Sequence, residues 1–220
     1  ASLVLVHVLR AARWRFLLRP LGDIPLRNVV LVSWIGFGAI LLWPLRSGEV
    51  VRPYLVTKRS SVRLWEATGT VAAERLVDAL VLSVVLLAGL SFATRLDPLP
   101  DHVGALPVPA AAVPNVAYLA LLGSAAAFLV MIAFYVARDR ARRVVQGVLG
   151  LVSSRLAESV ARIVERTASG LGFLPAPRLL LPFLAETLSY WAVNALGVWL
   201  LLWATGLPGP TLAEACVVVG

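Results

Sequence analysis

The chain has 220 residues, of which 60% are apolar and only 15% are charged. Soluble domains hold about 45–50% apolar and about 25% charged residues, so this composition excludes an ordinary soluble globule and indicates a protein of the lipid bilayer. The formal charge of +8 comes from 20 basic and 12 acidic residues. In so apolar a chain, this charge indicates cytoplasmic loops that face anionic lipid and argues against nucleic acid as a partner.

The apolar segments predict an all-α fold, a polytopic transmembrane helical bundle. A helix needs about 20 apolar residues to cross a bilayer, and the runs here are continuous, unlike the alternating strands of a membrane β-barrel. Because apolar runs are cut at both ends, we expect a single domain that is truncated at both termini. We expect the end of a span at 1–18, whole spans at 67–94, 116–137 and 179–206, and the start of a span at 211–220.

Arginine is concentrated in two connections, at 10–27 and 138–178. The positive-inside trend places both on the cytoplasmic side, and the proline-rich loop 95–115 is then external. Within the second connection, apolar residues recur every three or four positions and arginines fill the other face. This pattern predicts an amphipathic helix at 141–170 that lies along the cytoplasmic interface. A helix that packs its apolar face on a protein core is the alternative.

The segment 28–66 is predicted to be a re-entrant helical hairpin, which enters the membrane, turns and returns to the same side. The chain must be cytoplasmic before residue 28, and again near residue 66, where the span 67–94 starts. One simple crossing cannot satisfy both conditions. Pro44 cannot continue a helix and Gly48 relaxes the backbone, which favours a turn between them. Non-helical backbone at that depth must be buried in protein or line a wet cavity.

Two clusters of charged residues fall at or near membrane depth, where a charge costs about 2.5–3.5 kcal/mol at the bilayer centre. Spacings of three and four residues let members of each cluster share a helix face. We predict that the arginines hold an anionic group such as a lipid phosphate, while the carboxylates orient them or contact a cationic or hydroxylated head group. Interhelical salt bridges that fix the hairpin to the next span are the alternative. The members are Arg46, Glu49, Arg52, Glu74, Arg75 and Asp78.

A third polar group lies in the span 179–206. Glu186, Ser189, Tyr190 and Asn194 can share one helix face, at offsets of three, four and eight residues. We predict that Glu186 and Asn194 add a further wall to the same lipid-binding cavity. A single glutamate that is protonated, or bonded to the backbone of a neighbouring helix, is an equally good interpretation.

Sequence motifs of soluble enzymes are absent from the chain. It contains no Gly-x-Ser-x-Gly, no phosphate-binding glycine loop and no Cys-x-x-Cys. The two histidines, His7 and His102, are too few and too far apart for a histidine metal site, so we expect no metal and no cofactor. Glu74 and Asp78 could act as acid and base, which keeps a membrane-embedded glycosyl- or acyltransferase as the alternative to transport.

The charged clusters resemble a known family. Pro44-Leu-Arg46-Ser-Gly48-Glu49-Val-Val-Arg52, followed by Ala73-Glu74-Arg75-Leu-Val-Asp78, is similar to the paired signatures of the lysylphosphatidylglycerol synthase transmembrane-region family, also described as flippase-like. The upstream stretch Leu9-Arg10-Ala-Ala-Arg13-Trp14-Arg15-Phe-Leu-Leu is similar to a third stretch of that family. The resemblance runs along nearly the whole chain.

This resemblance implies a multi-pass domain of the plasma membrane that moves an anionic lipid between leaflets. An aminoacylated phospholipid or a polyprenyl-linked glycolipid would be the substrate. The partners we expect are anionic lipid head groups, together with a second copy of the chain or a lipid-synthesis enzyme. A scaffold that recruits such an enzyme is a further alternative, in which the surface of the helix 141–170 carries the function.

Overall fold

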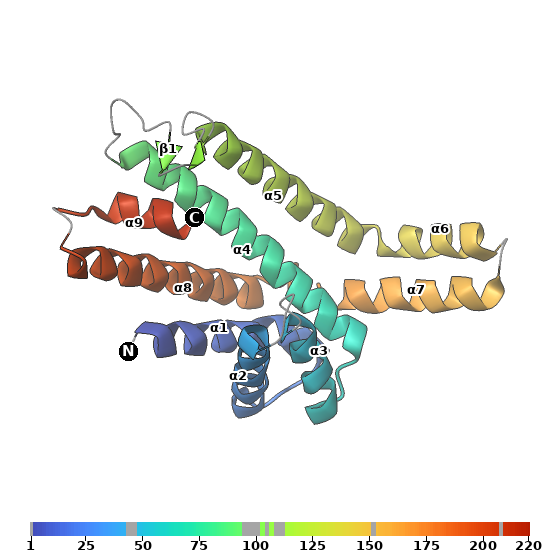
Figure 1. The fold of residues 1–220 in the computed structure, drawn as a ribbon. Helices are drawn as coiled ribbons and strands as arrows, with labels where there is room; N and C mark the ends of the chain where they lie inside the picture. Colours follow the sequence, from blue (N-terminus) through green and yellow to red (C-terminus); the bar gives the residue numbers. More distant parts are fainter. Residues whose placement is uncertain are drawn as a thin grey trace. The chain divides into compact units, whose positions relative to one another are not determined.

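The computed structural model describes residues 2–42, 48–93, 102–103, 106–107, 113–150, 153–206 and 209–220. The chain divides into two compact units. The first contains residues 3–75 and 129–187, and the second contains residues 76–128 and 188–220. The long helices α4, α5 and α8 each contribute one part to either unit (Figure 1).

The described residues form nine α-helices and one pair of two-residue strands. This confirms the all-α class, because the antiparallel pairing of β1 (His102–Val103) with β2 (Leu106–Pro107) is confined to a connection. The helices are α1 (Ser2–Leu18), α2 (Leu26–Leu42), α3 (Gly48–Arg59), α4 (Leu64–Phe92), α5 (Val113–Val136), α6 (Arg138–Gly150), α7 (Ser154–Ser169), α8 (Pro177–Ala204) and α9 (Leu212–Val219).

Three of these helices, α4, α5 and α8, are long and apolar enough to cross a membrane. They contain 29, 24 and 28 residues, and a helix needs about 20 residues to cross a bilayer. Each begins two or three residues before the span predicted for it. Their apolar side chains are largely uncovered within the protein, as Leu119 and Leu122 of α5 illustrate. A helix that is apolar all round and uncovered is what a lipid environment requires.

The single amphipathic helix predicted at 141–170 is instead two helices. α6 ends at Gly150, and α7 begins after Ser153, whose side chain caps it by accepting a hydrogen bond from the backbone N–H of Leu156. The two helices pack side by side (Figure 1), and Arg142 and Glu165 form an ion pair between them at 3.4 Å. The apolar repeat does not reveal the break, because two consecutive amphipathic helices show the same repeat as one long helix. Their placement at the interface remains a prediction.

The start of α4 is held against the end of α7 by a close backbone contact within the first unit. A Cβ atom on Gly69 would overlap the carbonyl oxygen of Thr167, and one on Gly170 would overlap that of Glu66. Only glycine permits this approach, since it has no side chain. The contact fixes the N-terminal turns of α4. In the same unit, α2 and α3 pack against each other.

Candidate anion-binding site

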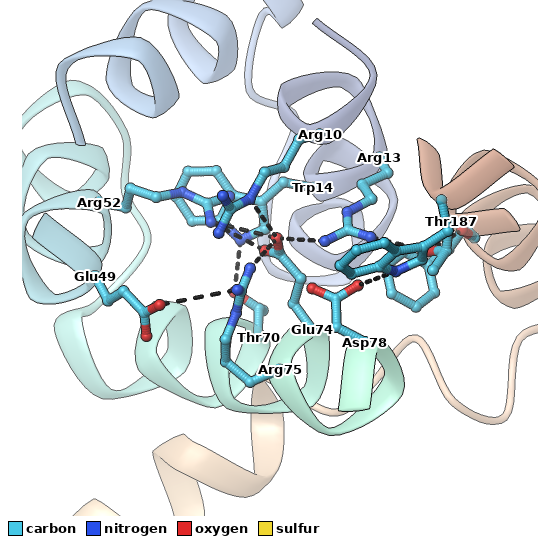
Figure 2. A network of polar contacts seen from close by, with 12 residues as sticks. Arg10, Arg13, Trp14, Glu49, Arg52, Thr70, Glu74, Arg75, Asp78 and Thr187 are labelled. Atoms are coloured by element: carbon cyan, nitrogen blue, oxygen red, sulfur yellow. Dashed lines mark hydrogen bonds and ion pairs between the residues drawn. The ribbon is translucent and has the colours of Figure 1, made fainter. Parts of the chain in front are cut away.

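The first unit contains a fully buried carboxylate, Glu74 of α4, which is surrounded by arginines (Figure 2). Arg13 and Arg75 donate hydrogen bonds to its Oε1 at 2.9 and 2.8 Å. Nη1 of Arg52 lies 3.1 Å from Oε2. Nε of Arg10 lies further away, at 3.8 Å from Oε1. One carboxylate is therefore shared among four guanidinium groups.

These side chains meet because three helices present polar faces to one point. Arg10 and Arg13 lie three residues apart on α1 and so share a face. Arg52 comes from α3, and Glu74 and Arg75 come from α4. Arg13 and Arg52 are fully buried, and Arg10 keeps only 12% of its side chain exposed. We name the group formed by Arg10, Arg13, Arg52 and Glu74 the buried cluster.

Aromatic rings lie over two of the three guanidinium groups of the buried cluster, those of Arg10 and Arg52. The guanidinium carbon of Arg52 lies 4.3 Å from the ring centre of Trp14 and 5.4 Å from that of Phe37. Arg10 lies 4.5 Å from the Phe37 ring. These distances are within the range of cation–π attraction. Trp14 is fixed in turn, because its indole N–H donates to the hydroxyl of Thr70 at 3.0 Å.

A more accessible pair borders the buried cluster. Nη1 of Arg75 lies 3.8 Å from Oε1 of Glu49, and their side chains are 29% and 30% exposed. We call Glu49 and Arg75 the rim pair. On α8, the hydroxyl of Thr187 accepts a hydrogen bond from Arg13 at 3.4 Å. The exposure of the polar side chains therefore increases from Arg13 and Glu74, which are fully buried, to the rim pair, which is partly exposed.

The buried cluster gathers three arginines around one carboxylate. Arg52 lies on α3, outside the three candidate spans. Burial lowers its pKa to about 10, against the opposing attraction of Glu74, so Arg52 stays charged at neutral pH. Arginine recognises phosphate and carboxylate groups with paired hydrogen bonds. The arrangement is therefore suited to an anion.

Four of the residues predicted from sequence interact with one another, and three others have contacts of their own. Asp78 belongs to the second unit, where it accepts a hydrogen bond from the indole of Trp191 at 3.3 Å. The Asn194 side chain donates to the carbonyl of Tyr190 on its own helix at 2.9 Å. Glu186 forms an ion pair with Arg15 at 3.6 Å. Arg46 lies outside the described residues. The four that meet are Glu49, Arg52, Glu74 and Arg75.

Arg10 and Arg13 were missed as site residues, and their assignment to a connection at 10–27 was wrong. α1 continues to Leu18, so both arginines are helical and face inward. Their spacing of three residues was the available signal, but the same arginines also fit a cytoplasmic loop. Among the residues that the structure describes, no group of three His, Cys, Asp or Glu is placed to hold a metal ion.

Comparison with known proteins identifies the family. The lysylphosphatidylglycerol synthase TM region family matches residues 1–220. A similar curated protein is the glycosyltransferase AglD of Haloferax volcanii, which is 28% identical over 214 residues. The match covers 90% of this chain and 34% of AglD, so the chain spans about a third of the length of that relative. No solved structure matches. With the match along its whole length, the chain belongs to the family of lysylphosphatidylglycerol synthase transmembrane regions.

Proposed function

We propose that this protein binds the anionic head group of a membrane lipid at the buried cluster and moves the lipid between the two leaflets. The observation that carries the proposal is the gathering of four arginines, Arg10, Arg13, Arg52 and Arg75, around one buried glutamate. In a helix bundle that spans lipid, ionisable residues are costly and generally serve transport or binding. The plasma membrane is the location we propose, as the resemblance implies.

The hairpin 28–66 supports the same proposal. α2 has 17 residues and α3 has 12, which correspond to about 26 and about 18 Å of helix. Each helix is shorter than the bilayer core, which is about 30 Å thick. The two helices pack against each other. We propose that they enter the membrane and return, which brings Arg52 to head-group depth. Arg46, Asp78, Glu186 and Asn194 remain predicted members of the lipid-binding site.

The geometry favours binding over catalysis by Glu74. A general base must reach the proton that it removes, but Glu74 is fully buried and contacts Arg13, Arg52 and Arg75 at 3.1 Å or less. The name of the relative AglD refers to a protein about three times as long. We propose that the region shared with this chain handles the lipid, and that a lipid-synthesis enzyme is the partner that supplies it.

The proposal can be tested by reconstitution. The purified protein is placed in vesicles with a fluorescent phosphatidylglycerol, and the rate at which dithionite bleaches inner-leaflet probe is measured. Arg52→Gln and Arg75→Gln should lower this rate, because each removes a donor for the head group. Arg59→Gln is the matched control, since Arg59 is exposed on the same helix as Arg52. Wild-type rates in both site variants would rule out the assigned site.

A further inference from the structure

The hairpin formed by α6 and α7 keeps large apolar side chains uncovered. Val144 and Val148 lie four residues apart on α6, so they share one face of that helix, and they are 62% and 60% exposed. Leu156 of α7 is 47% exposed. The two helices pack on each other, yet the side chains that α7 buries are all alanines. The packing of the hairpin therefore leaves its larger apolar side chains free for another contact.

These apolar residues lie on one side of the hairpin. The ion pair between Arg142 and Glu165 marks the opposite side. Val144 follows Arg142 by two residues, which is about 200° around the helix. Leu156 precedes Glu165 by nine residues, or about two and a half turns. Both apolar residues therefore point away from the ion pair, and we call the side that holds Val144, Val148 and Leu156 the apolar face.

The carboxylates of the hairpin gather away from the apolar face and are used there by arginines. α6 and α7 together contain seven arginines and three carboxylates. Glu158 lies seven residues before Glu165, which is about two turns, so the two share one side of α7. Glu158 pairs with Arg162 at 3.5 Å, and Glu165 pairs with Arg142 at 3.4 Å.

Arginines that border the apolar face carry unpaired charge. Arg140 precedes Val144 by one turn of α6, and Arg155 is the chain neighbour of Leu156 on α7. Both arginines are exposed, and neither forms an ion pair with a residue that the structure describes. An apolar strip edged by unpaired arginines is complementary to a surface that is apolar below and negatively charged above.

The head-group region of an anionic bilayer is such a surface. α6 begins at Arg138, two residues after the end of α5, which is a candidate membrane span, so the hairpin starts next to the membrane. Basic amphipathic helices bury their apolar side at this boundary, and arginine side chains are long enough to reach the phosphates. A second copy of the chain, docked through the same face, would instead bring like charges together.

We propose that the α6–α7 hairpin docks through its apolar face on the surface of an anionic lipid leaflet, with Arg140 and Arg155 on lipid phosphates. This surface shares no residue with the buried cluster, so the proposal goes beyond the function proposed above and does not depend on it. Its consequence is that the position of the hairpin responds to the amount of anionic lipid in the leaflet.

A fluorophore on the apolar face tests the proposal. In a Cys216→Ser background, Val148→Cys carries the polarity-sensitive dye NBD. The purified full chain is placed in vesicles of phosphatidylcholine, or of phosphatidylcholine mixed equally with phosphatidylglycerol. We expect the emission to shift to shorter wavelengths in the mixed vesicles, and nitroxide-labelled lipid to quench it. Glu158→Cys is the matched control, since Glu158 is exposed on the opposite side, and its dye should show neither effect.

Charge-directed changes show whether the arginines carry the docking. Arg140→Gln/Arg155→Gln should abolish the shift of the Val148→Cys dye, whereas Arg59→Gln, at an exposed position of α3, should keep it. Raising the salt from about 0.1 to about 1 M shortens the Debye length from about 10 to about 3 Å, and should reverse the shift in the unsubstituted hairpin.

Three results would overturn the proposal. Equal shifts in both kinds of vesicle would show that the face enters lipid without recognising charge. A shift that persists in the double arginine variant would show that Arg140 and Arg155 do not bind phosphate. Absence of a shift in either vesicle would leave the face to a protein partner. None of these results bears on the buried cluster, and Arg52→Gln should dock as the wild type does.

Discussion

Glu74 is the residue on which the buried cluster depends, because it is the counter-ion shared by the surrounding arginines. Arg13 and Arg75 bond one of its oxygens, and Arg52 pairs with the other. Removing one partner of a buried ion pair generally costs more than the pair contributes, since the remaining charge is left desolvated and alone. Here one substitution at Glu74 would leave several such charges.

Glu74→Gln should therefore destabilise the protein by about 3–5 kcal/mol, even though the amide nearly preserves the shape of the side chain. The measurement is thermal unfolding of the purified protein in detergent, followed by tryptophan fluorescence. The double variant Glu74→Gln/Arg52→Gln should recover part of this loss, because it also removes one uncompensated charge. If the losses of the two single variants simply add, then Glu74 and Arg52 are not coupled, and Glu74 does not act as the counter-ion of Arg52.

At the scale of elements, the position of α4 decides where Glu74 lies. Gly69 is five residues before Glu74 and one before Thr70, which holds Trp14 over Arg52. A side chain at Gly69 meets the backbone at Thr167, and backbone cannot move aside as a flexible side chain can. The packing of α4 on the end of α7 is thus linked to the geometry of the arginines.

Gly69→Ala should cost about 1–3 kcal/mol, which is the usual range for overpacking, and should also weaken binding of anionic lipid. Gly123→Ala is the matched control, because nothing lies within 4 Å of a Cβ atom at that helical position. Both are measured by thermal unfolding and by lipid titration. Equal stability of the two variants would show that α4 can shift away from α7 without loss.

Sequence patterns predicted some elements better than others, for physical reasons. The helices α4, α5 and α8 were predictable because a bilayer imposes length and continuous apolarity on a span. The hairpin of α6 and α7 was not, because two packed amphipathic helices show the same repeat as one long helix. Within the site, Arg52 and Glu74 stood out as charges in apolar surroundings. Arg13 did not, because only the tertiary structure shows that a charge at the end of α1 turns inward.

At the scale of the whole molecule, the positive-inside trend assigns each connection to one side of the membrane. α4, α5 and α8 give three candidate crossings. If the arginine-rich helices α6 and α7 are cytoplasmic, α4 must start on the cytoplasmic side as well. A chain that is also cytoplasmic before α2 can reach that point only if α2 and α3 together return to the side from which they came.

Cysteine labelling tests this topology. In a Cys216→Ser background, which removes the native thiol, single cysteines are placed at Arg27, Ser61, Arg143 and Thr205, all of which are exposed. A membrane-impermeant maleimide should label positions 27, 61 and 143 only from the cytoplasmic side, and position 205 only from the other side. Labelling of 27 and 61 from opposite sides would show that the segment between them crosses the membrane. The re-entrant hairpin would then be wrong, and Arg52 would lie on a different path from the one proposed.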